Sequence, residues 1–173
     1  MGQHRTATAP DYRTDFFGWT QHQAKLLLTL RRLGAQLPAE LDLDRVAEEV
    51  QDLGGAELNS VKSLVRQTMV HLVKAASDPG SAASKHWRSE AASFHADNLD
   101  RYATSMRRDI DMQPLWRRAR DLAELQLQEH DRTLVPVLPK VCPFAVDDFM
   151  AEKFSFDGML KRICPANSAA NQE

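Results

Sequence analysis

The sequence predicts an all-α fold, a single-domain helical bundle of about four to five main helices. Proline is absent over residues 39–78, 80–113 and 115–135, so long helices meet no proline break there. The alternation of β-branched and polar residues that is typical of strands does not occur. With 173 residues, 43% of them hydrophobic and 27% charged, the chain has the length and composition of one soluble globular domain.

We expect a disordered arm over residues 1–10, a single helical domain over residues 11–164, and a disordered tail over residues 165–173. No apolar run approaches the roughly 18 residues that a membrane-spanning helix needs, and no signal-peptide pattern opens the chain. The sequence therefore predicts a cytoplasmic protein with no membrane partner. The net charge of -2 gives no global electrostatic reason to expect nucleic acid.

The first helix is expected to begin near Thr14 or Asp15, either of which can act as an N-cap, and to run to about Arg32. One stripe of this segment carries apolar residues at intervals of three and four, interrupted by a single glutamine. We expect this stripe to face the core. It consists of Phe16, Trp19, Gln23, Leu26, Leu27, Leu30 and Leu33.

The second helix is expected to be capped by Asp42 or Asp44 and to continue to Ser77. Its predicted core face consists of Val46, Val50, Leu53, Val61, Leu64, Val65, Met69, Leu72 and Val73. Two adjacent glycines, Gly54 and Gly55, cost about 2 kcal/mol relative to alanines in a helix interior. Since an unbroken helix here would be about 50 Å long, the sequence predicts a kinked or broken second helix.

The remaining helices are predicted from their apolar spacing and their prolines. A third helix should run from Ser84 towards Asp109, and a fourth should carry Pro114 in its first turn and end before Pro136. A loop rich in proline should then lead to short helical segments over residues 146–154 and 159–163.

Several blocks of sequence together resemble one bacterial family. They include Asp15-Phe16-Phe17-Gly18-Trp19, then Leu41-Asp42-Leu43-Asp44 with Ala47-Glu48-Glu49-Val50, and later His71-Leu72-Val73-Lys74 and Leu138-Pro139. The family is described only as a domain of unknown function, number 29. The resemblance covers about residues 11–154. It implies an all-helical fold in a soluble bacterial protein, and it brings no catalytic residues with it.

The acidic stretch over residues 40–57 is a candidate metal site. It holds seven carboxylates against Arg45 alone. Glu48 and Asp52 lie one helical turn apart, and His71 could add a nitrogen ligand to a set of Glu48, Glu49, Asp52 and His71. The alternative, which we favour, is that carboxylates gather at a helix N-terminus because the helix dipole stabilises them.

The basic stretch over residues 101–120 is a candidate nucleic-acid site. Its arginines could grip phosphates, and Trp116 could stack on a base if it is exposed. The candidate residues are Arg107, Arg108, Arg117, Arg118 and Arg120. We favour the alternative that this stretch pairs with the acidic one, within one chain or between chains, so that nucleic acid is not an expected partner.

No catalytic signature of a known kind occurs. The sequence lacks a phosphate-binding loop, a Gly-x-Ser-x-Gly nucleophile motif, His-Glu-x-x-His, and any Glu three residues before a His. His86 and Glu90 lie one turn apart, a weak two-ligand pair that we interpret as a hydrated surface pair. We interpret His71 as a core histidine that packs against Trp19.

These observations favour a non-enzymatic helical interaction module that binds itself or a protein partner and needs no cofactor. Two alternatives stay open. One is a divalent-metal site or metal-dependent hydrolase that uses Glu48, Glu49, Asp52 and His71, and the other is nucleic-acid binding through the arginines between Arg101 and Arg120.

Overall fold

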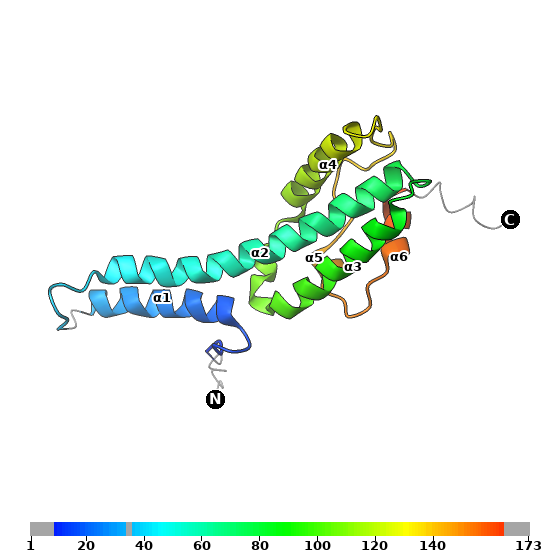
Figure 1. Ribbon diagram of the computed structural model, residues 1–173. Helices are drawn as coiled ribbons and strands as arrows, with labels where there is room; N and C mark the ends of the chain where they lie inside the picture. The colour runs from blue at the N-terminus through cyan, green and yellow to red at the C-terminus, as the bar shows by residue number, and fades with distance from the viewer. Residues whose placement is uncertain (1–8, 34–35, 165–173) are drawn as a thin grey trace. The chain divides into compact units, whose positions relative to one another are not determined.

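The computed structural model describes residues 9–33 and 36–164, and every regular element among them is a helix (Figure 1). The all-α prediction is therefore confirmed. The helices are α1 (Phe16–Arg32), α2 (Leu43–Ser77), α3 (Ser84–Arg101), the 3₁₀ helix η1 (Thr104–Asp109), α4 (Met112–Gln128), α5 (Val146–Phe149) and α6 (Phe156–Ile163). None of the helices in the described ranges is both long and apolar enough to cross a membrane.

The chain forms two compact units. The hairpin unit consists of Met1–Asn59 and Ala103–Asp109, and the bundle unit consists of Ser60–Tyr102 and Ile110–Glu173. Helix α2 supplies residues to both. The expected single domain over residues 11–164 stays a prediction, and the expected arm and tail lie outside the described residues except for Ala9 and Pro10.

Helix α2 is continuous over 35 residues and passes through Gly54 and Gly55 without interruption. Of the two alternatives predicted at these glycines, a kink or a break, the break does not occur, and the kink stays a prediction. Packing explains why a glycine occupies position 54. A Cβ on Gly54 would collide with the Thr20 hydroxyl and lie 3.2 Å from Thr20 Cβ, so α1 and α2 approach each other where a side chain is missing.

In the hairpin unit, α1 runs antiparallel to the first part of α2. The Gln21 side chain donates to the Gln51 carbonyl oxygen at 3.4 Å, and Arg31 forms an ion pair with Asp44. The buried residues of the two helices range from glycine and alanine to leucine and phenylalanine. The buried residues are Phe17, Thr20 and Ala24 on α1, and Leu43, Ala47, Gly54 and Leu58 on α2.

The predicted core face of the hairpin is wrong on both helices. On α1, Leu26, Leu30 and Leu33 are 45%, 42% and 75% exposed. On α2, Val46 and Leu53 are 39% and 57% exposed. The distance between two packed helices depends on the side chains at their contact, and here the smaller residues let the backbones come close while the leucines turn outward.

The start of α1 agrees with the prediction. The Asp15 carboxylate caps the helix by accepting a hydrogen bond from the Gly18 backbone N–H at 2.8 Å. The same carboxylate oxygen accepts a hydrogen bond from the Ser105 hydroxyl at 2.6 Å, which attaches η1 to the hairpin unit.

In the bundle unit, the predicted core face of α2 is confirmed. Val61, Val65, Met69, Leu72 and Val73 are buried, and Leu64 is half-buried. The chain after α4 is held by the bundle through a tryptophan. Trp116 is fully buried, and its indole N–H donates to the Pro139 carbonyl oxygen at 2.8 Å.

Two predicted helix ends differ from the structure. Helix α3 ends at Arg101 because Tyr102 adopts extended backbone angles, and the chain continues into η1. Asn98 in the last turns of this helix is buried, and its side-chain amide donates to the Phe149 carbonyl oxygen at 3.2 Å. Helix α5 is shorter than the predicted segment and ends at Phe149.

The two neighbouring glycines of α2 provide a matched test of the close approach. Gly54→Ala should lower the free energy of unfolding by about 1 to 3 kcal/mol, because the new methyl group overpacks against Thr20. Gly55→Ala should raise it by up to about 1 kcal/mol, because nothing lies within 4 Å of its Cβ position and alanine favours the helix. Urea unfolding measures both values, and equal effects at the two positions would contradict the packing argument.

Candidate functional site

The first candidate is an apolar row on α1, which we call the leucine row. It consists of Trp19, Gln23, Leu26, Leu30 and Leu33, with the alternating spacing of four and three residues that coiled coils use. Its three leucines are exposed, while Trp19 and Gln23 are half-buried. A shorter row on α2, Val46, Val50 and Leu53, has the same spacing. Val46 and Leu53 of this second row are exposed, and Val50 is half-buried.

The two helices of the hairpin carry opposite charge. Helix α1 contains Lys25, Arg31 and Arg32 and no carboxylate. Residues 43–59 contain five carboxylates and one arginine. The hairpin therefore carries exposed apolar rows on two oppositely charged helices. Basic α1 attracts acidic helices, and the acidic first part of α2 attracts basic ones.

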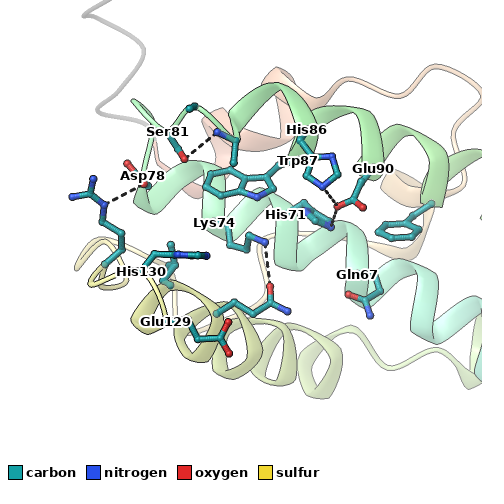
Figure 2. Close-up of a pocket in the computed structure, with 16 residues that line it drawn as sticks. Gln67, His71, Lys74, Asp78, Ser81, His86, Trp87, Glu90, Glu129 and His130 are labelled. Carbon is teal, nitrogen blue, oxygen red and sulfur yellow. Dashed lines mark hydrogen bonds and ion pairs between the residues drawn. The ribbon is translucent and has the colours of Figure 1, made fainter.

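The second candidate is a cavity of about 720 Å³ in the bundle unit (Figure 2). One face of α2 forms its first wall, with Gln67, His71 and Lys74 at successive turns, and Asp78 continues this wall directly after the helix. Helix α3 forms a second wall, and the end of α4 with the residues after it forms a third. The walls combine aromatic, basic and acidic side chains.

A carboxylate on α3 joins two histidines at this cavity. The His71 Nε2 atom lies 3.2 Å and the His86 Nε2 atom 3.3 Å from the same Glu90 oxygen (Figure 2). The His86–Glu90 pair that we expected at the surface is therefore present, and buried His71 from α2 adds to it. The His71 ring also packs against Phe94, with the ring centroids 5.7 Å apart.

His71 is a neutral imidazole at neutral pH. Burial, and to a smaller extent the charge of Lys74, lowers its pKa from 6.5 to about 4, although the Glu90 carboxylate acts in the opposite direction. Because an ionised carboxylate only accepts hydrogen bonds, the single proton of the ring lies on Nε2 and points to Glu90. The Nδ1 atom is buried and has no hydrogen-bond partner among the described side chains and backbone groups, which costs free energy.

Lys74 occupies the middle of the cavity wall and is half-buried. Its ammonium donates to the Gln126 amide oxygen at 3.1 Å and lies 5.0 Å from the centre of the Trp87 ring (Figure 2). Burial lowers the pKa of Lys74, while the charges of Glu90 and Glu129 act in the opposite direction. Perturbed basic groups of this kind gather at binding and catalytic sites more often than elsewhere.

The candidate metal ligands are divided between the two units. Glu48 and Glu49 are exposed on α2 in the hairpin unit, where Arg45 contacts them at 2.9 and 2.8 Å, and Asp52 is exposed nearby. His71 belongs to the bundle unit. Over residues 9–33 and 36–164, no three side chains of the metal-binding types are placed to hold an ion.

The candidate nucleic-acid residues are also divided. Arg107 and Arg108 are exposed on η1 in the hairpin unit, whereas Arg117, Arg118 and half-buried Arg120 lie on α4 in the bundle unit. The expectation that Trp116 could stack on a base is wrong. Its ring is fully buried and packs edge-on against Phe144, with the centroids 5.9 Å apart.

The expected contact between Trp19 and His71 involves residues of different units, and it stays a prediction. Within the hairpin unit, Trp19 is half-buried and packs against Tyr12 and Phe16, with centroid distances of 4.9 and 6.1 Å.

Sequence reasoning missed the cavity, although a signal was present. Gln67, His71, Lys74 and Asp78 follow the spacing of four, three and four that marks one helix face, inside a segment whose other faces are strongly apolar. A polar row on an otherwise buried helix must face either water or a cavity. Considered alone, His71 has the pattern of a core histidine. The polar row becomes apparent only when the four residues are considered together.

The low pKa of His71 predicts a specific loss of stability in acid. As the pH falls from about 6.5 to about 4, the unfolded chain takes up a proton that native His71 does not bind. The free energy of unfolding should therefore fall over this range by up to about 3 kcal/mol through this residue, and no further below it.

Urea unfolding of the parent and of His71→Gln at several pH values measures this contribution as a difference. The parent should lose its advantage over the variant as the pH falls through the window. A difference between the two proteins that is the same at pH 7 and pH 4 would contradict a neutral buried imidazole.

Comparisons with other proteins agree with the fold. A crystal structure at 1.45 Å resolution of an alpha-helical protein of unknown function from Rhodospirillum rubrum ATCC 11170 is 37% identical and superposes with a TM-score of 0.82, covering 88% of this chain and 97% of that one. No curated protein sequence matches the chain. The profile of the family described as "Domain of unknown function DUF29" matches residues 12–155. The chain belongs to this family of domains of unknown function.

Proposed function

We propose that the protein is a non-enzymatic helical interaction module that associates with a second copy of itself through the hairpin unit. The observation that carries the proposal is the exposure of the leucine row, whose spacing is that of a helix that packs against another helix. Within the hairpin unit, α1 contacts α2 and, at Asp15, η1, and the three leucines of the row stay exposed beside both contacts. Two such hairpins can complete a four-helix arrangement in which the outward leucines become a core.

A second copy is favoured over an unrelated partner because the hairpin is self-complementary. Basic α1 of one copy can face the acidic first part of α2 of the other, and a twofold axis repeats the same pairing. The leucine row of one copy then packs against the Val46, Val50 and Leu53 row of the other. Each apolar row is covered, and like charges stay apart.

Substitution of the middle leucine tests the interface. Leu30→Glu should weaken self-association at least about a hundredfold, because each dimer loses two buried leucines, each worth about 1.5 kcal/mol or more. Leu125→Glu is the matched control, since Leu125 is an exposed leucine of α4 in the bundle unit. Sedimentation equilibrium of the three proteins measures the association constants.

The parent and Leu125→Glu should sediment as dimers at concentrations where Leu30→Glu is a monomer. Circular dichroism checks that each variant keeps its helix content. A parent that stays monomeric over the accessible concentration range, or a Leu30→Glu variant that dimerises as strongly as the parent, would contradict the proposal.

A further inference from the structure

We propose that the cavity of the bundle unit binds a small organic anion, a carboxylate or a phosphate monoester attached to an apolar body, with Lys74 as the residue that selects its charge. This site lies in the bundle unit and does not depend on self-association through the hairpin.

The size and the walls of the cavity suit such a ligand. Its volume of about 720 Å³ falls within the range of roughly 300 to 1,000 Å³ that small-molecule sites occupy. Trp87 and Leu127 are buried in its walls, and Phe94 is half-buried. These three residues offer apolar surface to the body of a ligand, while the polar groups between them can fix its orientation.

Some charged groups of the cavity contact a group of the opposite charge. The ammonium of Lys74 contacts none among the described residues, and it therefore favours an anion as the ligand. The Glu90 carboxylate lies 3.2 Å from His71 and 3.3 Å from His86, and the Asp78 carboxylate lies 3.4 Å from the Arg132 guanidinium. The ammonium of Lys74 contacts two neutral groups, the amide of Gln126 and the ring of Trp87.

An anion at Lys74 would gain more than these neutral groups give. Hydrogen bonds between an ammonium and a carboxylate or phosphate oxygen are about twice as strong as those between neutral groups. A bound anion also favours the protonated form of Lys74 and so offsets the effect of burial on its pKa. A cation at the same place would be repelled by the ammonium. Glu129 at the exposed end of the wall weakens the attraction for an anion without cancelling it, because it faces water.

A set of probes with one shared aromatic ring separates charge from shape. Benzoate and phenyl phosphate are the carboxylate and phosphate probes, benzyl alcohol is the neutral probe, and benzylamine is the cationic probe. Calorimetric titration of the full chain measures their affinities, and the indole N–H resonance of Trp87 reports that a probe enters the cavity. At least one anion should bind about tenfold more tightly than benzyl alcohol, and benzylamine should bind more weakly than benzyl alcohol.

Variants of Lys74 test its role. Lys74→Gln should abolish the preference for the anion, and Lys74→Arg should retain it because the positive charge is kept. Lys85→Gln is the matched control, since Lys85 is an exposed lysine of α3 outside the cavity wall. It should bind all four probes as the parent does.

A variant of the exposed residue Glu129 tests the same proposal if Lys74→Gln does not fold. Glu129→Gln removes the negative charge near Lys74 and should tighten anion binding. The proposal would be overturned if none of the four probes binds, if benzylamine binds as tightly as the anions, if Lys74→Gln keeps the anion preference, or if Glu129→Gln leaves anion affinity unchanged.

Discussion

The close approach of α1 and α2 at Gly54 determines which side chains the hairpin unit buries. Thr20 is fully buried, its hydroxyl donates to the Phe17 carbonyl oxygen at 2.8 Å, and it leaves no room for a Cβ on Gly54. Two alanines, Ala24 on α1 and Ala47 on α2, are also buried. Phe17, Leu43 and Leu58 are buried as well, whereas Leu26, Leu30 and Leu33 lie on another face of α1. The three leucines of the row thus stay exposed outside the close contact at Gly54.

In the bundle unit the same helix solves a different packing problem. Val61, Val65, Met69 and Val73 bury one face of α2 almost completely. The polar row that includes His71 and Lys74 lies on another face and lines the cavity. The side chains of α3 and α4 do not fill the space there, and Glu90 and Gln126 reach across to the polar row instead. Polar pairing replaces apolar packing along this side of α2.

Sequence patterns predicted the helices well because proline positions, caps and periodicity are local properties. Asp15 and Ser77 mark helix ends where expected, and the apolar face from Val61 to Val73 is confirmed. The hairpin face was mispredicted because periodicity favours the bulkiest stripe, whereas the contact selected the stripe with Thr20 and Gly54. Which stripe of a helix is buried depends on the distance between the two helices. The sequence of one helix alone does not determine that distance. The cavity was missed for a similar reason, since it needs three helices to form.

Both candidates, the leucine row and the cavity, carry features that cost the protein solubility or stability. Exposed leucines cost solubility, and a buried imidazole with an unpartnered Nδ1 costs stability. Burial disfavours the charged forms of His71 and Lys74 and so lowers both pKa values. An apolar residue at either position would not carry this cost. Proteins keep such features mainly where binding or chemistry needs them, because stabilising substitutions are otherwise easy to find. The exposed leucines of the row lie on α1 in the hairpin unit and the His71 imidazole lies at the cavity of the bundle unit, while Ala47, Val61, Val65 and Val73 on the contact faces of α2 are buried.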